Sequence, residues 1–353
     1  MMKEFYKMFT KMKDNPNQKY ALATIINVNG SSYRKEGAKM MIGLDGSSCG
    51  MISGGCLEED LYYRAIDVIQ SSLPKTVTYD LMSEDDLGWG QGAGCNGIID
   101  VYIEPFYWYY QSSSFDESIY SLLAEEVQKE RQIISIKNID SAECYFHTWE
   151  GNLIGYPSNL NVFSEELHEE LEKFIQKDVS FESVCLISGD QTIIFEKYEP
   201  KEHLYIFGAG PDAEPLVEFA AKLDFSVKVI DPRENRCNVQ NFHAADSLIV
   251  EFPSGFFLNH DIDSEGYVII MTHNFERDQD ILQRLMDQPL KYLGILGPRR
   301  RTRRLLSQQD IPENIHSPIG LDIDAEGAEE ISFSILAEMI KVRNSRVNQT
   351  VQL

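Results

Sequence analysis

The sequence is poor in cysteine, in tryptophan and in long apolar runs, and each shortage excludes a class of protein. Six cysteines and three tryptophans occur in 353 residues, and no two cysteines are spaced as CxxC. A small secreted domain held by disulfides is therefore excluded, and we expect free thiols and a cytoplasmic location. No uncharged apolar run reaches the ~18 residues that a bilayer-spanning helix needs, so we expect no transmembrane segment.

Positive charge is also scarce. The chain carries 32 Lys and Arg against 56 Asp and Glu, a net charge of −24. Nucleic-acid binding depends on neutralising phosphates, and an anionic membrane surface would repel such a chain, so we expect neither as a partner. An anionic ligand would need local help from cations or backbone N–H groups. The apolar fraction of 43% is that of a folded globular protein, which excludes disorder as the main state.

The pattern of elements changes near residue 200 and predicts two domains. Strand-like and helical segments alternate with glycine-rich loops over residues 20–104, and we expect a β-rich extension of the same domain over about 106–200. The chain is thus predicted to be α/β, with a mixed α/β N-terminal domain (1–200) and a Rossmann-type doubly wound parallel sheet (203–343). The second prediction rests on compact apolar runs that alternate with helical stretches: HLYIFG, FSVKVID, SLIVE, YVIIMT and YLGILG.

A dinucleotide-binding pattern opens the second domain. A strand runs directly into Gly208-Ala209-Gly210-Pro211-Asp212-Ala213, which fits G-x-G-x-x-G/A before a helix. Gly208 permits the tight turn, Gly210 lets a pyrophosphate approach, and Ala213 allows close packing of the helix. Asp231 ends the next strand, where a carboxylate binds a ribose diol. Arg233 follows it and suits a 2′-phosphate, which leaves NAD and NADP both open. The alternative is a Rossmann-type sheet that binds no nucleotide.

A cluster of arginines marks a second strand–helix junction. Gly297-Pro298 ends a strand, and five of the next six residues, Arg299–Arg304, are arginine. A helix cannot direct all of them at one ligand, so we expect one or two, Arg299 and Arg300 at the helix start, to bind an anion. The alternative is a solvated helix face that pairs with acidic neighbours.

Two glycine-flanked cysteines stand out in the first domain. Cys56 follows Gly54-Gly55 at a predicted helix start, where a thiol can become reactive, although the acidic residues after it oppose this. Cys95 lies in a second glycine-rich loop, GWGQGAGCNG. We expect the two cysteines to share a site, and their spacing matches no zinc pattern. The alternative is that Cys56 is a small packing residue.

A third loop of the first domain is rich in cations. The segment GSSYRKEGAKM (30–40) carries Arg34, Lys35 and Lys39 after a predicted strand, and these side chains suit an anionic ligand. The alternative is an ordinary polar loop.

Taken together, these motifs resemble the XdhC/CoxI family, the xanthine dehydrogenase accessory factors. GSSYRKEGAKM, ISGGCLEED and GAGCNG are similar to the family's N-terminal signatures. The C-terminal resemblance lies in FGAGPDAEPL, VIDPR, MTHNFERDQDIL, LGILGPRRR and PIGLDIDAEGAEEISFSILAEMI. The resemblance covers roughly residues 20–104 and 203–341. It departs at Pro211-Asp212, where the family commonly has His and an apolar residue.

The resemblance implies a cytoplasmic maturation factor without catalytic residues of its own. Such a chaperone binds molybdenum cofactor, helps to keep it sulfurated and inserts it into a xanthine-dehydrogenase-type enzyme, with a cysteine desulfurase as a second expected partner. Cys56 is the family's main candidate for contacting the cofactor, and Gly54, Gly55, Cys95 and Arg34 are expected around it. We expect a homodimer, on general frequency alone.

Two other functions remain open from the sequence. One is an NAD(P)-dependent oxidoreductase, for which no obvious acid–base set appears; His273 and Asp278 in MTHNFERD are candidates, and the alternative is a polar pair at a helix entry after a strand. The other is a nucleotide-sensing regulatory protein without turnover.

Overall fold

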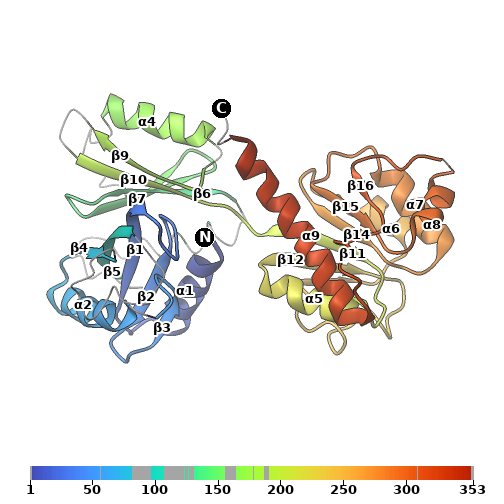
Figure 1. Ribbon diagram of the computed structural model, residues 1–353, viewed down its shortest axis with the longest axis horizontal. Helices are drawn as coiled ribbons and strands as arrows, with labels where there is room; N and C mark the ends of the chain where they lie inside the picture. Colours follow the sequence, from blue (N-terminus) through green and yellow to red (C-terminus); the bar gives the residue numbers. More distant parts are fainter. Residues whose placement is uncertain are drawn as a thin grey trace. The chain divides into compact units, whose positions relative to one another are not determined.

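The computed structural model describes residues 2–55, 57–81, 97–106, 123, 126, 131–155, 164–177, 179–186, 191–307 and 309–350. The chain forms two compact units, Met1–Pro200 and Lys201–Leu353 (Figure 1). The predicted fold class is confirmed, because the first unit contains helices with antiparallel sheets and the second has a parallel sheet of six strands. Among the described residues, none of the helices has the length and hydrophobicity of a membrane span.

The first unit begins with an antiparallel sheet in the order β3-β2-β1-β5-β4. Side chains alternate along β1, so that Ala21, Ala23 and Ile25 pack on helix α2 while Tyr20 and Leu22 face the opposite side. The elements are α1 (Met2–Asp14), β1 (Tyr20–Gly30), β2 (Lys39–Gly43), β3 (Ser48–Gly50), α2 (Glu58–Ser71), β4 (Lys75–Asp80) and β5 (Gly97–Phe106).

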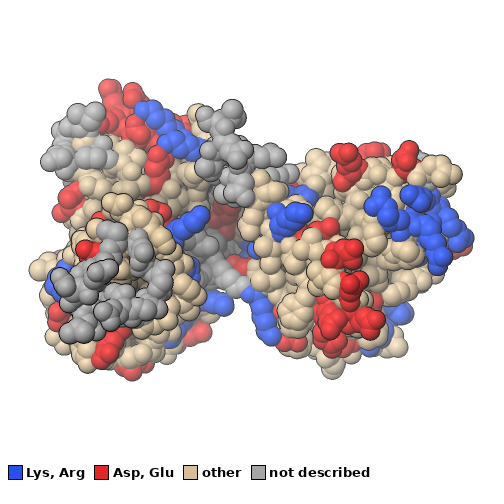
Figure 2. Space-filling view, viewed as in Figure 1, with Lys and Arg blue, Asp and Glu red and all other residues tan. Residues whose placement is uncertain are grey.

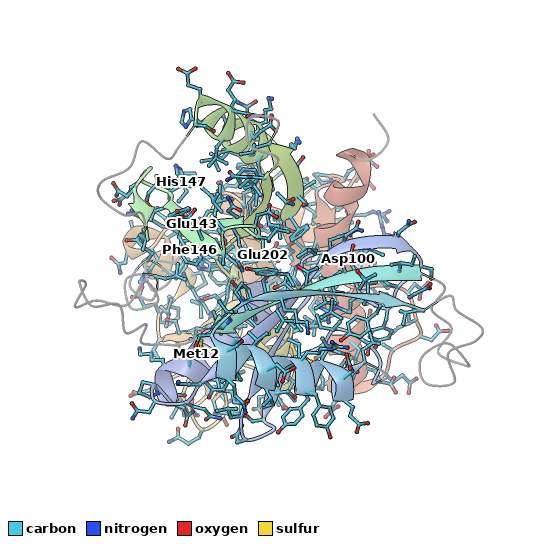
Figure 3. All side chains as sticks on the ribbon, turned by 90° about the vertical axis from the view of Figure 1, so that its left-hand side faces the viewer. Met12, Asp100, Glu143, Phe146, His147 and Glu202 are labelled. Carbon is cyan, nitrogen blue, oxygen red and sulfur yellow. The ribbon has the colours of Figure 1, made fainter. Side chains whose placement is uncertain are left out.

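A second antiparallel sheet, in the order β8-β7-β6-β10-β9, covers the other face of the first. The core between the sheets includes Met12 of α1 and Phe146 of β7, both labelled in Figure 3. Helix α4 packs on the far face of this sheet through Leu167, Leu171 and Phe174. The elements are β6 (Ile133–Asn138), β7 (Glu143–Thr148), β8 (Leu153–Ile154), α4 (Glu165–Gln176), β9 (Phe181–Leu186) and β10 (Gln191–Tyr198).

The second unit is a doubly wound sheet in the order β13-β12-β11-β14-β15-β16. Helices α5 and α9 cover one face, and α6, α7 and α8 the other (Figure 1). The strand order reverses between β11 and β14, which is where ligands of such sheets bind. The elements are β11 (Glu202–Phe207), α5 (Ala213–Lys222), β12 (Phe225–Ile230), β13 (Ser247–Ile249), α6 (Pro253–Asn259), β14 (Tyr267–Ile270), α7 (Phe275–Leu285), β15 (Tyr292–Ile295), α8 (Arg299–Leu306), β16 (Ile315–His316) and α9 (Gly327–Thr350).

Candidate functional site

The loop after β1 lies beside the start of β5 and beside the loop before α2, at one end of the first sheet. Gly30, at the end of β1, pairs with Gly97, at the start of β5. The ring of Tyr33, in the loop after β1, lies 3.9 Å from the position that a Cβ on Gly54 would take. The structure therefore brings the loop that carries Arg34 beside the loop that carries Gly54 and Gly55. Cys56 and Cys95 lie outside the described residues, so their predicted shared site stays a prediction.

The chain between β3 and α2 is held by its own hydrogen bonds. The buried hydroxyl of Ser53 accepts from the N–H groups of Gly55 (3.3 Å) and Leu57 (3.1 Å) and donates to Glu58 (2.6 Å). The Glu58 carboxylate also accepts from the Ser53 and Leu57 N–H groups. These donors are therefore occupied within the chain. Helix α2 begins at Glu58, two residues after Cys56.

The same loop leaves bare backbone facing solvent. Gly54 and Gly55 are exposed, and a Cβ on Gly55 would meet nothing within 4 Å. Gly55 has φ +114°, a conformation that glycine adopts without strain. The neighbouring Lys35 is exposed and Arg34 is half-buried. Open backbone beside the ring of Tyr33, in a loop that also carries Arg34 and Lys35, fits the approach of a large, flat ligand.

The structure corrects the assignment of Lys39 to an anion site. Lys39 lies on β2 with only 1% of its side chain exposed, and its ammonium is 2.6 Å from the Glu196 carboxylate on β10. It also donates to the Thr24 hydroxyl at 3.1 Å. Burial lowers the pKa of Lys39, and the charge of Glu196 opposes this shift. Lys39 belongs to the core between the two sheets, because it lies on a strand and not in the preceding loop.

The second unit builds the predicted glycine turn at the carboxyl end of β11. Gly208 has φ +123°, and a Cβ there would collide with the Met271 carbonyl, so only glycine fits. Asp231 follows β12 and accepts from the Ala209 N–H at 2.9 Å. Its two oxygens also pair with the Arg233 guanidinium, at 2.8 and 2.7 Å. Burial raises the pKa of Asp231, but the hydrogen bonds from Arg233 and Ala209 outweigh burial, and the net pKa is lowered.

A pair that the sequence did not predict lies beside this turn. His273 follows β14, and its Nε2 is 2.7 Å from the Asp212 carboxylate. His273 therefore does not pair with Asp278. The Asp278 side chain is 2% exposed and pairs with Arg301 at 2.6 Å, and it also accepts from the Thr272 hydroxyl. His273 and Asp278 are thus each bound to a different partner.

The arginines of α8 separate into anchored and free side chains. Arg301 pairs with Asp278. Arg299 donates to the Ser317 carbonyl at 3.1 Å, and Arg304 stacks on Phe275.

The other two arginines of α8 are exposed. Among the described residues, Arg300 and Arg303 have no side-chain partner. Figure 2 shows Lys and Arg side chains gathered over this end of the second unit. Anion binding by Arg299 and Arg300 stays a prediction.

No group of three or more His, Cys, Asp or Glu side chains among the described residues is arranged to hold a metal ion.

Two family models match this chain, one in each unit. Residues 15–80 match the XdhC and CoxI family, and residues 204–339 match the XdhC Rossmann domain. A probable xanthine dehydrogenase subunit from Bacillus subtilis (strain 168) is 37% identical over 345 residues, which are 97% of this chain and 98% of that protein. The chain belongs to the XdhC and CoxI family.

Two further relatives extend the comparison. A crystal structure described as a xanthine dehydrogenase from Bacillus halodurans is 39% identical, with a TM-score of 0.79 and 96% of both chains covered. The molybdenum cofactor insertion chaperone PaoD of Escherichia coli (strain K12) is 23% identical over 330 residues, 91% of this chain and 83% of that one. In this XdhC and CoxI family chain, the first matched region contains the loops of Arg34 and Gly54, and the second contains the Gly208 turn.

Proposed function

We propose that this protein is an accessory factor that binds molybdenum cofactor and inserts it into a xanthine-dehydrogenase-type enzyme. The observation that carries the proposal is the meeting of Tyr33 with the exposed Gly54-Gly55 backbone, in a region that matches the XdhC and CoxI family. One relative is named as a molybdenum cofactor insertion chaperone and another as part of a probable xanthine dehydrogenase, and both names support the same role.

The residues at this end of the sheet fit the cofactor by their chemistry. Bound cofactor would supply a molybdenum centre, which accepts a soft thiolate ligand, and Cys56 is the residue that we assign to provide one. Gly54 and Gly55 leave the backbone open to a flat ring system. The N–H groups of Gly55 and Leu57 are already used by Ser53 and Glu58, so the phosphate would need a cation.

Arg34, near Gly54 through its neighbour Tyr33, is the cation that we assign to that phosphate. We place Cys95 at the same site, because its segment joins β5 at Gly97, beside Gly30. The proposal extends to a sulfurated cofactor, with a cysteine desulfurase as sulfur donor, and to a homodimeric assembly.

Cofactor retention by matched cysteine variants tests the proposal. The protein is loaded with cofactor, gel-filtered and analysed for molybdenum and pterin. Wild type should retain both in a fixed ratio to protein, and Cys56→Ala should lose them while keeping its melting temperature. Arg34→Ala should weaken retention by about tenfold, the effect of one charge-assisted hydrogen bond.

Cys144→Ala is the control, because Cys144 lies on β7 and burial raises the pKa of its thiol to about 11. It should retain cofactor like wild type. Full retention by both Cys56→Ala and Arg34→Ala would show that these loops are not the cofactor site.

A further inference from the structure

We propose that the carboxylate of Asp212 occupies the place over the glycine turn that a ligand pyrophosphate takes in dinucleotide-binding Rossmann domains, and that this domain therefore excludes phosphate-bearing nucleotides. The inference does not rest on the proposed function, because it concerns only the second unit. Asp212 and His273 are then specificity-determining residues at the switch point of the sheet, where the strand order reverses between β11 and β14.

The position of Asp212 is the first observation. The second glycine of the pattern lacks a side chain so that a pyrophosphate can come close to its backbone. Here that space holds Asp212 Oδ1, which a Cβ on Gly210 would strike. Asp212 Oδ1 is buried and accepts no hydrogen bond from the described residues. An anionic oxygen already lies where an anionic ligand would have to go, and like charges in a partly buried site repel.

The donors of the turn are the second observation. A pyrophosphate is normally bound by backbone N–H groups at the start of the helix. Pro211 has no N–H, the Ala213 N–H donates to the Gly210 carbonyl at 3.1 Å, and the Ala209 N–H donates to Asp231. Three positions of the turn, 209, 211 and 213, therefore offer a pyrophosphate no unoccupied N–H donor.

His273 is the third observation, because it fixes the carboxylate in this place. Its Nε2 lies 2.7 Å from Asp212 Oδ2, which leaves Oδ1 over the glycine. His273 has φ +57°, a left-handed conformation that is uncommon for a non-glycine residue. Two loops that follow adjacent parallel strands, β11 and β14, are thus joined across the switch point.

The ribose subsite is closed in a similar way. Asp231 accepts from the Ala209 N–H and from the backbone and side chain of Arg233, so that a ribose diol would have to displace the guanidinium. The fold and the glycine pattern of a dinucleotide domain are therefore retained, while both subsites hold groups of the chain itself.

Calorimetric titration of the full-length protein with NAD, NADP, FAD and ADP tests the inference. Wild type should bind none of them at about 1 mM, a concentration at which even weak specific binding is measurable. Asp212→Ala removes the carboxylate and should bind at least one of them with a Kd of about 0.1 mM or lower, tenfold below that limit. Asp212→Asn keeps the shape of the side chain and removes its charge. If this variant also binds nucleotide, charge repulsion is the cause of the exclusion.

Two further variants test whether nucleotide binding depends on the space and charge at Asp212. Glu218→Gln removes a carboxylate elsewhere on α5 and should bind no nucleotide, as in wild type. Adding Gly210→Val to Asp212→Ala should abolish the gained affinity, since the new side chain fills the freed space. Equal binding of NAD by wild type and Asp212→Ala would overturn the inference, and so would an absence of binding to both, because Asp212 would not then be the barrier.

Discussion

At the scale of single residues, Asp231 shows how a buried carboxylate is made stable. The side chain is almost completely buried, and its oxygens accept from the Ala209 N–H, the Arg233 N–H and the Arg233 guanidinium. These contacts stabilise the charged form, so that the lowered pKa of Asp231 is also a contribution to folding.

Asp231→Asn should lower the free energy of unfolding at pH 7 by about 1–3 kcal/mol, the usual loss when a buried charged acceptor is removed. The folded pKa of Asp231 lies below its unfolded value, so its contribution is complete above pH ~4 and is lost as pH falls through the folded pKa. Urea unfolding of wild type and variant at pH 7 and under increasingly acid conditions measures this difference.

The difference between wild type and Asp231→Asn should be constant from pH 7 to about 5 and should shrink below pH ~4. Glu234→Gln, an exposed neighbour, is the control and should match wild type throughout. A difference that persists undiminished in acid would contradict this explanation.

At the scale of elements, buried ion pairs join the two sheets of the first unit. Lys39 of β2 pairs with Glu196 of β10, and Lys137 of β6 pairs with Glu104 of β5. Burying charges is costly unless they are paired, so each partner depends on the other. The second sheet is in this way fixed to the sheet whose end carries the candidate cofactor loops.

Lys39→Met should destabilise the protein by about 3–5 kcal/mol, because it leaves Glu196 charged and buried without its partner. Lys39→Met with Glu196→Met should recover most of this loss, since an apolar pair of similar volume replaces the ions. Guanidinium unfolding of the two single variants and the double variant measures the coupling. The exposed pair Arg131–Glu150 is the control, and its removal should cost at most about 1 kcal/mol. Additive losses in the Lys39–Glu196 cycle would show that the two buried charges do not stabilise each other.

The arginines of helix α8 should differ in how much they contribute to the stability of the fold. Arg301→Ala leaves the buried Asp278 carboxylate without its cation and should cost about 3 kcal/mol or more. Arg300→Ala changes an exposed side chain and should change stability by less than about 0.5 kcal/mol. Thermal unfolding of the two variants side by side measures the contrast. Equal melting temperatures would show that the Asp278 pair does not stabilise the helix.

At the scale of the whole molecule, the sequence predicts the features that depend on neighbouring residues along the chain. The strand–glycine–helix pattern at Gly208 predicts the tight turn, since only glycine fits there. The alternation of strands and helices that follows predicts the parallel sheet. Pairs that are distant along the chain are not predictable in this way. Lys39 follows a polar loop in the sequence yet is buried against Glu196, and Asp212 meets His273 across 61 positions. Such contacts depend on how sheets and loops pack, which no periodicity encodes.

Reconstitution of a molybdoenzyme tests the proposed delivery of molybdenum cofactor by this protein. Cofactor-free xanthine-dehydrogenase-type enzyme is mixed with a fixed amount of cofactor, either free or preloaded on this protein, and the growth of enzyme activity is followed. We predict faster and more complete activation from the preloaded protein, and a return to the free-cofactor rate with Cys56→Ala. Activation that is the same with and without the protein would show that it does not deliver the cofactor.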